Sequence, residues 1–564
     1  MKRRSKYNRI KDIDPDEIFL DSENLPNFNK QQFEGRLEKP IPKRSIIFLS
    51  SFFVIVLGFF VWRTVDLQIV NGEAYLEKSE NNTLNKHPIF ADRGLIYDRN
   101  GVLLAWNKWP EEDLEKMSFP KRAYYSLPGF SHLLGYTSAP AKDSAGFYWQ
   151  DRFVGKDGVE KYYDEKLTGQ NGVKITETDA VGKVQSENIV LLPIEGEDIT
   201  LTIDSRIQEK MYKAISEMAH NVSFQGGSGL IMDIQNGELL SIVNYPEYDS
   251  NILSEGKDKQ KINSFLDDKR KVFLNRSISG LYSPGSIVKP FLAYGALEEE
   301  IITPEKEILA NGTISIPNPY YPDLKSIFKD HDVFGYVDMR QAISVSSDIY
   351  FYEIGGGFED QQGLGISKID EYSKMFGLGV KTGIDLKGEQ GGLIPDPVWK
   401  AKVFDGDPWR VGDTYNTAIG QYGFQVTPIQ MVKAVAVLAN KGKLFTPHIL
   451  KEDNEKIFSE GELLLDEDKL KVVFEGMRMA VTEGTCLALN TPELEVAAKS
   501  GTAQVGFGNT NTNSWIIGFF PYQNPRYAFA LVMERGPKSA SGNATWVMRQ
   551  VVDFMVKETP EYFD

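Results

Sequence analysis

Residues 281–290, Leu281-Tyr282-Ser283-Pro284-Gly285-Ser286-Ile287-Val288-Lys289-Pro290, place a hydroxyl and an amine three positions apart. A helix tolerates proline only near its first turn, so Pro290 predicts a helix that starts close to Ser286. Positions i and i+3 share one face of a helix, which brings the Lys289 amine within reach of the Ser286 hydroxyl. This pairing suits a serine nucleophile with a lysine base, and the NH groups of a helix start can stabilise an oxyanion.

The spacing alone is weak evidence, because Ser-x-x-Lys occurs elsewhere in this chain. The other matches are Ser118 to Lys121, Ser254 to Lys257 and Ser326 to Lys329. Ser286 is distinguished by the Pro-Gly dipeptide before it, by the apolar residues after it, and by two companion motifs.

A second hydroxyl beside the lysine would pass protons onward without adding a charge. Ser346-Ser347-Asp348 lies on a run, Met339 to Tyr352, that the sequence predicts to be helical. Ser346 is the candidate for this hydroxyl, and Asp348 is the candidate for a polar anchor. The alternative is a solvated helix face, which is the usual role of such residues.

A substrate with a carboxylate needs a cation and hydroxyls on a rigid strand edge. Lys499-Ser500-Gly501-Thr502 continues an apolar strand signal, and Gly501 would let a substrate backbone approach closely. The similar tripeptide Lys381-Thr382-Gly383 sits in a glycine-rich segment rather than on a strand. Lys499 is therefore the predicted cation, and the predicted substrate-binding residues are Ser500, Gly501 and Thr502.

Length and composition limit the class of protein to which this chain can belong. The 564 residues suffice for two or three domains. A net charge of -16, without a basic stripe, argues against a nucleic-acid partner. The single cysteine, Cys486, excludes an intramolecular disulfide and a cysteine-based metal cluster, and we expect it to be a small buried residue. The histidines lack helical ligand spacing, and nothing indicates a serine-histidine-carboxylate triad.

The amino-terminal part predicts a membrane anchor. Residues 1–44 are polar and predict a largely disordered cytoplasmic tail. Residues 45–62 carry no charge and are long enough to cross the membrane as a helix, which we place at 45–63. A cleaved signal peptide is the alternative, but the segment starts late and no small-x-small site follows. Basic residues crowd its amino side, so the remainder of this single-pass protein is expected outside the cytoplasmic membrane.

Residues 64–197 carry strong turn signals but no chemistry that composition can identify. Asn100-Gly101 between apolar residues predicts a hairpin. The nearby charged residues are expected to form exposed structural ion pairs; they are Asp92, Arg93, Asp98 and Arg99.

Residues 198–564 predict an α+β domain. A strand at 198–203 leads to Asp204, which is placed to cap a helix, and Asn236-Gly237 joins two apolar strands. Helical and loop-rich sequence fills residues 286–490. Late strand signals and a last helix follow, at 496–499, 515–520, 527–534 and from about Thr545. Strands at both ends imply an antiparallel sheet flanked by helices, with an all-helical subdomain between them.

The order Ser286-x-x-Lys289, Ser346-x-Asp348, Lys499-Ser500-Gly501 resembles the penicillin-binding proteins and serine β-lactamases. Residues 93–101 and the single amino-terminal anchor are similar to those of the class B, monofunctional transpeptidases. Three further motifs are similar to those of elongation-type members; they lie at residues 412–416, 419–421 and 427–430. Asp348 is also similar to the elongation type, because division-type members usually carry Asn at this position. The resemblance covers about residues 45 to 550.

This resemblance implies a peptidoglycan D,D-transpeptidase that β-lactams inhibit, with a pedestal domain at 64–197 and a transpeptidase domain at 198–564. Ser286 would attack the carbonyl between the terminal D-alanines of a stem peptide and release D-alanine. Lys289 would take the proton, Ser346 would relay it, and Lys499 would hold the carboxylate. An amine from a neighbouring stem would resolve the acyl-enzyme. The implied membrane partner is an elongation-type glycosyltransferase of the shape, elongation, division and sporulation (SEDS) family.

The chain departs from this family in three places. Some members bind zinc through carboxylates, a histidine and a cysteine near the second motif, but no cysteine lies near Asp330, His331 and Asp332, so we predict no metal and no cofactor. Tyr422 stands where glycine is usual, and the membrane-proximal region is short. These last two departures bear on the pedestal's partner contacts rather than on catalysis.

The alternatives are a division-type transpeptidase, a β-lactamase-like hydrolase or carboxypeptidase, a β-lactam-binding sensor, and a structural scaffold of the envelope. In a hydrolase or carboxypeptidase, water rather than an amine would attack the acyl-enzyme. The long extramembrane segment argues against both of these enzymes. A sensor is usually coupled to a larger cytoplasmic or multi-pass module. A scaffold would not need three catalytic motifs in this order.

Overall fold

The computed structural model describes most of the chain, in ranges separated by gaps. They are residues 43–73, 84–109, 119–178, 184–318, 321, 323–452, 458–506, 510–538 and 543–563. The chain divides into two compact units, one of Met1–Asn85 with Glu177–Ser186 and one of Lys86–Thr176 with Glu187–Asp564. Every predicted site residue lies in the second unit.

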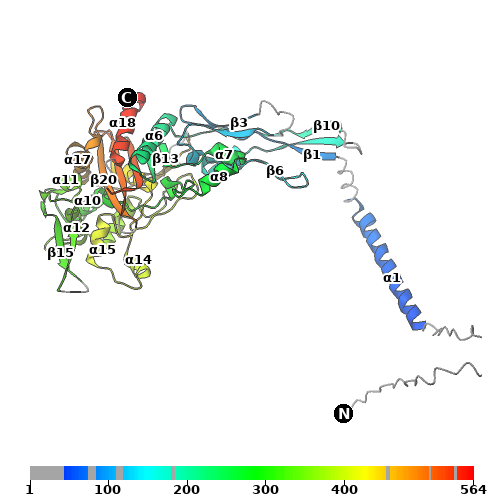
Figure 1. Ribbon diagram of the computed structural model, residues 1–564, viewed down its shortest axis with the longest axis horizontal. Helices are drawn as coiled ribbons and strands as arrows, with labels where there is room; N and C mark the ends of the chain where they lie inside the picture. Colours follow the sequence, from blue (N-terminus) through cyan, green and yellow to red (C-terminus); the bar gives the residue numbers. More distant parts are fainter. Residues whose placement is uncertain are drawn as a thin grey trace, which may run out of the picture. The chain divides into compact units, whose positions relative to one another are not determined.

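The first unit contains α1 (Lys43–Val65), which continues into the π-helix η3 (Asp66–Val70). Residues 46–70 are apolar and long enough to cross a membrane, and they form the one such helix in the described part of the chain (Figure 1). The spanning segment predicted at 45–63 therefore lies within a single helix. The predicted disordered tail falls outside the described residues, except for Lys43 and Arg44, which begin α1.

The region predicted to be a pedestal is built from short strands and helices. They are β1 (Leu84–Ile89), β2 (Ile96–Tyr97), β3 (Leu103–Lys108), β4 (Lys121–Tyr124), α3 (Ser131–Leu134), β5 (Thr137–Ser138), β6 (Ala141–Lys142), β7 (Tyr148–Gln150), β8 (Val154–Gly155), α4 (Gly158–Tyr162), α5 (Asp164–Leu167), β9 (Gly172–Thr178) and β10 (Val184–Leu191). β2 pairs antiparallel with β3 across Asn100-Gly101, and Gly101 has a φ of 81°. The predicted hairpin is thus confirmed.

The charged residues near this hairpin are not all exposed, contrary to the prediction. Arg93 and Asp98 are buried. Glu160, also buried, accepts hydrogen bonds from Arg93 Nε at 2.6 Å and from Arg122 Nε at 2.7 Å. These partners come from segments far apart in sequence, so local sequence could not reveal them. A buried charge requires such partners, because removing one leaves the other uncompensated.

The strand predicted at 198–203 is shorter in the structure. β11 (Ile199–Thr200) pairs in parallel with β2, within a sheet of order β11-β2-β3-β4. Asp204 then caps α6 (Ser205–Val222) by accepting a hydrogen bond from Arg206 N, as predicted. The domain boundary at 197/198 remains a prediction.

A five-stranded antiparallel sheet of order β13-β12-β22-β21-β20 organises the rest of the unit. Its strands are β12 (Gly226–Asp233), β13 (Leu239–Tyr245), β20 (Ala497–Val505), β21 (Asn511–Phe520) and β22 (Tyr527–Pro537). β12 and β13 flank Asn236-Gly237, and β12 pairs with β22. The early hairpin and the late strands thus form one sheet, as predicted.

Helices cover both faces of this sheet (Figure 1). α6 and α18 (Ala544–Glu558) pack on one face, where alternate strand residues such as Ile516 join their core. α16 (Pro428–Ala439) and α10 (Lys289–Glu298) share the core on the other face with Trp515 and Ile517. Burial of these side chains, at about 25 cal/mol per Å² of apolar surface, holds the sheet and its edge strand β20 in place.

The remaining elements are mostly helical. They are α7 (Ser250–Glu255), α8 (Lys259–Leu266), α9 (Arg276–Ser279), η4 (Gly285–Val288), β14 (Ile308–Ala310), β15 (Thr313–Pro317), β16 (Lys325–Lys329), β17 (Gly335–Val337), α11 (Met339–Val345), α12 (Asp348–Gly356), α13 (Gly365–Met375), α14 (Pro397–Val403), α15 (Val411–Ala418), β18 (Lys443–Phe445), β19 (Ser459–Glu462), α17 (Glu467–Thr482), η6 (Leu487–Leu489) and η8 (Pro560–Tyr562). The insertion also carries the two-stranded sheets β14-β17, β15-β16 and β18-β19, which the sequence did not predict.

The helix predicted across 339–352 is wrong, because the chain breaks between α11 and α12. Ser346 ends α11 with a φ of 64°, in the left-handed region. Ser347 caps α12, its hydroxyl accepting a hydrogen bond from Tyr350 N at 3.3 Å. Serine favours such capping over the interior of a helix. The break turns the carbonyl and hydroxyl of Ser346 toward Lys289.

Candidate active site

Ser286 lies on the single 3-10 turn η4, which continues directly into α10 with Pro290 in the first turn. The helix start predicted from Pro290 is confirmed. A 3-10 turn has three residues, so Ser286 and Lys289 lie on the same side of it. Ser286 lines a cleft, whereas Lys289 is fully buried beneath it.

Two glycines bring η4 against the edge strand β20. Gly285 has a φ of 60°, which favours glycine, and a Cβ there would lie 3.0 Å from Thr502 O. A Cβ on Gly501 would lie 2.9 Å from Ile287 Cγ2 and 3.0 Å from Pro284 O. Both positions therefore need a residue without a side chain, and the nucleophile turn contacts the strand directly.

Lys289 Nζ is held by the break between α11 and α12. It donates hydrogen bonds to Ser346 O at 2.7 Å, to Ser346 Oγ at 3.3 Å and to Asp348 Oδ1 at 2.7 Å. The predicted proximity of Lys289 and Ser346 is thus present. Among the described residues, no hydrogen bond joins Lys289 to Ser286. The amine instead has a carboxylate and a hydroxyl as partners, both of which can take part in moving a proton.

Lys499 lies on β20 and is fully buried. Its Nζ donates to Ser500 O at 2.8 Å. Burial, together with the positive charge of Lys289 nearby, lowers the pKa of Lys499 to about 7, although Cys486 and Asp348 oppose this shift. A buried amine with this pKa can change its charge when an anion enters. Cys486 is buried, as expected.

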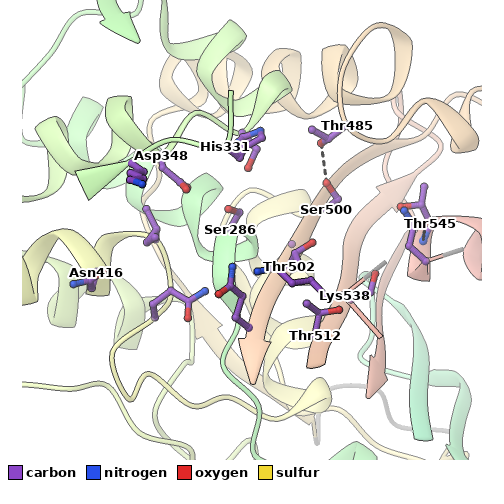
Figure 2. A pocket seen from close by; sticks show the side chains of 18 of the residues that line it. Ser286, His331, Asp348, Asn416, Thr485, Ser500, Thr502, Thr512, Lys538 and Thr545 are labelled. Carbon is purple, nitrogen blue, oxygen red and sulfur yellow. Dashed lines mark hydrogen bonds between the residues drawn. The ribbon is translucent and has the colours of Figure 1, made fainter. Parts of the chain in front are cut away.

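Ser500 and Thr502 lie on the free edge of the sheet, since β20 pairs only with β21 among the described strands. Ser500 Oγ donates to Thr485 Oγ1 at 2.8 Å (Figure 2). Thr485 follows α17, and its backbone NH donates to Ser344 O at 3.2 Å. It therefore connects the strand edge to α11. No sequence motif surrounds Thr485, so its place in the site could not be predicted from the sequence.

These groups border a cleft of about 840 Å³. Figure 2 shows Ser286 near its middle, with His331 and Asp348 on one side and Thr502, Thr512 and Lys538 on the other. The described lining residues are Phe224, Ser286, Lys329, His331, Ser346, Asp348, Tyr352, Asn416, Ile419, Gln421, Thr485, Ser500, Gly501, Thr502, Gln504, Thr512, Ser514, Lys538, Asn543 and Thr545. The three predicted motifs, separate in sequence, thus meet at one cleft.

The competing sequence patterns lie elsewhere or have a different geometry. Lys381 is exposed in a loop and does not line the described cleft. The chance match Ser326 to Lys329 falls on β16, where residues three apart point to opposite faces. Lys329 nevertheless lines the cleft, a position that its sequence neighbours did not indicate.

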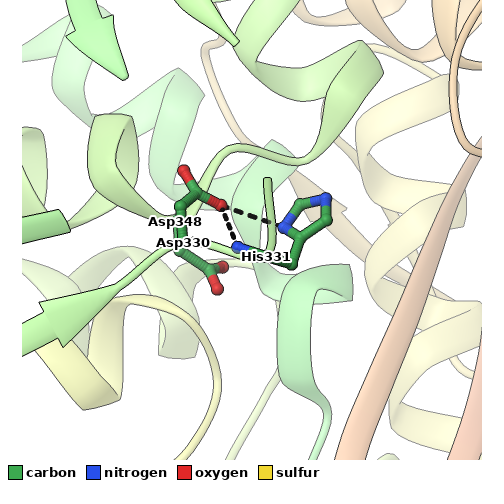
Figure 3. A group of neighbouring side chains, drawn as sticks. All are labelled: Asp330, His331 and Asp348. Carbon is green, nitrogen blue, oxygen red and sulfur yellow. Dashed lines mark hydrogen bonds and ion pairs between the residues drawn. The ribbon is translucent and has the colours of Figure 1, made fainter. Parts of the chain in front are cut away.

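Asp330, His331 and Asp348 form a group whose possible ligand atoms lie within 4.8 Å of one another (Figure 3). Asp330 Oδ1 lies 2.9 Å from His331 Nδ1, and Asp330 Oδ2 accepts from Ser347 Oγ at 2.7 Å. Burial would raise the pKa of Asp330, but hydrogen bonds from His331, the Asp348 backbone NH and Ser347 hold this pKa below its usual range.

The carboxylates of this group already serve as hydrogen-bond acceptors. Asp330 also receives the backbone NH of Ile349 at 3.0 Å, and Asp348 receives the ammonium of Lys289. A resident cation would compete with Lys289 for Asp348, so the donor set does not fit a metal centre well. The prediction that no metal is bound remains a prediction, and the group orients the start of α12.

Tyr422, the position at which the family resemblance leads us to expect glycine, has a φ of 60°. This left-handed conformation strains residues other than glycine. The Tyr422 ring stacks on Phe404 with an interplanar angle of 8° and makes edge contacts with Trp399 and Trp409.

Comparisons with known proteins agree with this geometry. Residues 227–553 match the penicillin binding protein transpeptidase domain, and residues 114–201 match the penicillin-binding protein dimerisation domain. The chain is 29% identical to the peptidoglycan D,D-transpeptidase MrdA of Salmonella typhimurium, over 92% of this chain and 96% of that protein.

Solved structures are similar as well. The structure of Pseudomonas aeruginosa PBP2 in complex with WCK 5153 is 30% identical, with a TM-score of 0.69, and covers 84% of this chain and 98% of that one. PBP2 of Helicobacter pylori, in its complex with MreC, is 27% identical with a TM-score of 0.68, over 84% of this chain and 99% of that one.

Proposed function

The chain belongs to the penicillin-binding protein transpeptidase family, and from this premise we propose how its residues perform the reaction. It is a serine acyl-transfer enzyme, a peptidoglycan D,D-transpeptidase of the elongation type that acts on stem peptides and binds β-lactams. The observation that supports the roles below most strongly is that Ser286 and Ser346 line one cleft, while the buried amine of Lys289 bonds to Ser346 Oγ and lies close enough to Lys499 to lower its pKa.

Acylation starts at Ser286. Its Oγ attacks the carbonyl carbon between the terminal D-alanines, and its proton passes to Lys289 once that amine is neutral. The backbone NH groups of Ser286 and Thr502 stabilise the oxyanion, and their position beside the Gly285 and Gly501 contacts supports this role. The C–N bond then breaks, and Ser346 relays a proton to the departing D-alanine.

Lys499, Ser500 and Thr502 hold the terminal carboxylate. An anion beside Lys499 favours its charged form, so substrate binding raises a pKa that lies near 7 in the free protein. The site is therefore most cationic when the correct ligand is present. An amine from a second stem next attacks the ester carbon, its proton returns to Ser286 Oγ, and an amide cross-link forms.

Labelling with a fluorescent penicillin tests the nucleophile. Ser286→Ala removes a small hydroxyl and no core volume, so it should abolish covalent labelling while leaving thermal unfolding unchanged. Lys381→Ala, in the exposed loop, is the matched control and should label normally. Labelling of Ser286→Ala at the wild-type rate would contradict the assignment. Analysis of cross-linked products then separates transpeptidation from hydrolysis.

The apolar helix α1 is consistent with a single-pass anchor. We place its amino terminus in the cytoplasm and the catalytic unit outside, because the basic residues Lys43 and Arg44 adjoin its amino end and Arg63 is the basic residue in its last turn. A reporter fused before Met1 should be cytoplasmic, and one fused after Asp564 should be external. Both reporters on one side would overturn this topology.

The elongation-type SEDS glycosyltransferase is the proposed membrane partner. A transpeptidase joins glycan strands but does not polymerise them, so another enzyme must supply the strands. Small residues on α1, Ser50, Ser51 and Gly58, would permit close packing against a second helix. The segment from Arg63 to Glu197 is the second proposed contact.

A further inference from the structure

The second half of the reaction, in which an amine resolves the acyl-enzyme, leaves one proton without a destination. The departing D-alanine needs only the proton that Ser286 gives up. The acceptor amine, by contrast, arrives as an ammonium, because an alkyl amine is protonated at neutral pH. It brings three protons and keeps one in the new amide. One of the other two restores the Ser286 hydroxyl, so a further group must take the remaining proton before the amine can attack.

The donor and the acceptor approach the ester from different walls of the cleft. The donor carboxylate is held on β20, by Lys499, Ser500 and Thr502. Figure 2 shows His331 and Asp348 on the other side of Ser286, and both residues line the cleft. The donor makes no use of His331, so this wall is left for the second stem.

The imidazole of His331 is held in place and open to the cleft. Its Nδ1 lies 2.9 Å from Asp330 Oδ1 (Figure 3). Its ring also packs edge-on against Phe334, with the ring centroids 5.1 Å apart. The side chain is 50% exposed, and its Nε2 has no hydrogen-bond partner among the residues that the structure describes. That nitrogen is therefore accessible to a ligand in the cleft.

Asp330 determines which nitrogen of a neutral His331 carries the proton. Burial would raise the pKa of Asp330, but hydrogen bonds, first among them that of His331, hold this pKa below its usual range. The carboxylate is thus ionised and can only accept hydrogen bonds. A neutral imidazole must then donate from Nδ1, which leaves the lone pair of Nε2 free to accept a proton.

The same carboxylate would stabilise the imidazolium that forms when Nε2 takes a proton. In the described part of the chain, Asp330 pairs with no lysine or arginine, so its charge faces His331 alone. The aspartate of a Ser-His-Asp triad orients and stabilises its histidine in this way. Asp330 and His331 therefore have the geometry of a general base.

His331 also lies close to the groups that move the other proton. A ring nitrogen of His331 and a carboxylate oxygen of Asp348 lie within 4.8 Å of each other, and Asp348 Oδ1 lies 2.7 Å from Lys289 Nζ. Lys289 Nζ in turn donates to Ser346 Oγ at 3.3 Å. Both routes for a proton therefore lead from the wall at which the acceptor amine arrives.

We propose that His331 is the general base for the acceptor: its Nε2 takes a proton from the ammonium of the second stem before the amine attacks the ester. The N–C bond then forms, the C–O bond to Ser286 breaks, and Ser346 returns the second proton to Ser286 Oγ. The imidazolium afterwards releases its proton to water, which the half-exposed side chain permits. Asp330 is the positioning residue. This role rests on the proposed function, but acylation does not require it.

The test measures the two halves of the reaction separately in the full chain. Fluorescent penicillin labelling reports acylation. Mass spectrometry reports transfer from a stem pentapeptide to a second stem peptide, which ends in a single D-alanine and carries a free side-chain amine. His331→Ala should slow transfer by about 100-fold, as expected for loss of a general base, and should label at nearly the wild-type rate. His220→Ala, at an exposed position of α6, is the matched control and should leave both rates unchanged.

Two further measurements distinguish a base from a structural residue. His331→Asn keeps a hydrogen-bond donor for Asp330 but has no basic nitrogen, so it should lose transfer as His331→Ala does. Hydroxylamine is largely unprotonated at neutral pH and needs no base. Transfer to hydroxylamine should therefore be nearly equal in the wild type and in both variants.

Four outcomes would overturn the role of His331. They are wild-type transfer in His331→Ala, equal loss of acylation and transfer, transfer restored by His331→Asn, and an equal loss of transfer to hydroxylamine. Transfer that EDTA abolishes and Zn²⁺ restores would also overturn it, because His331 would then act as a metal ligand. A wild-type chain that penicillin does not label would instead contradict the proposed function itself.

Discussion

Lys289 Nζ lies 2.7 Å from Asp348 Oδ1, although the side chain of Lys289 is fully buried. The amine beside the nucleophile is therefore paired with a carboxylate. This carboxylate compensates the buried charge and fixes the position of the amine next to Ser346.

Replacing Asp348 distinguishes the charge from the hydrogen bond. Asp348→Asn keeps an acceptor for Lys289, so penicillin acylation should stay within about tenfold of wild type. Asp348→Leu leaves the amine without this partner and should lower the free energy of unfolding by about 3 kcal/mol and acylation by about 100-fold. Urea unfolding and stopped-flow labelling measure the two effects. Equal damage by both substitutions would show that the charge, not the hydrogen bond, matters.

The pKa of Lys499 near 7 predicts a pH dependence. Only the charged form attracts a carboxylate, so kcat/KM for a stem peptide should fall as pH rises through about 7. Lys499→Arg stays charged and should lose this alkaline limb. A wild-type profile that is flat between pH 6 and 9 would contradict the role of Lys499.

The lowered pKa of Lys499 also makes the free energy of unfolding depend on pH. The folded chain releases the Lys499 proton near pH 7, whereas the unfolded chain holds it up to the ordinary pKa of 10.5. Unfolding therefore takes up a proton between these values, and this group's contribution to the free energy of unfolding rises with pH across that window. Below pH 7 the burial of its charge opposes folding in full.

Gly501→Ala tests the contact between η4 and β20. The new Cβ would lie 2.9 Å from Ile287 Cγ2, so the strand or the nucleophile turn must move. A shift of this kind should slow acylation by about 100-fold while reducing stability by only about 1–3 kcal/mol. Gly391→Ala is the control, since its Cβ would meet nothing closer than 3.7 Å. Wild-type acylation in Gly501→Ala would mean that the close approach is dispensable.

Exchanging α1 tests the membrane partnership. Replacing residues 45–62 by an unrelated spanning helix should leave penicillin acylation unchanged, because the cleft lies in the other unit. The exchange should reduce the amount of glycosyltransferase that co-purifies with the chain, and it should reduce the activation of the glycosyltransferase. A second variant replaces the segment from Arg63 to Glu197. Undiminished association and activation in both variants would reject the proposed contacts.

The strands of the main sheet could be predicted because apolar runs and turn residues are local signals. Asn236-Gly237 lies in the turn of its hairpin, and Asp204 caps its helix through the nearby Arg206 N. The nucleophile was also recognisable locally, because Pro290 sets the helix start. The apolar residues before Lys499 likewise predicted that it lies on a strand.

Other parts depended on contacts that no local pattern encodes. The break at Ser346 arises because Ser347 caps a new helix and bonds to Asp330, which lies on a different segment. Burial of Arg93 depends on Glu160 in the same way. Thr485 and Lys538 reach the cleft only through tertiary packing, so neither could be identified beforehand.

The order of the strands along the chain also governs when the enzyme becomes competent during its synthesis. β12 and β13 are complete by Tyr245, but their neighbour β22 begins only at Tyr527, and an isolated two-stranded hairpin is marginally stable at best. The nucleophile and its lysine therefore emerge from the ribosome long before the strand that carries the carboxylate-binding residues. A growing chain holds the reactive serine without a formed cleft, and reactivity toward D-alanyl peptides arises in one late step.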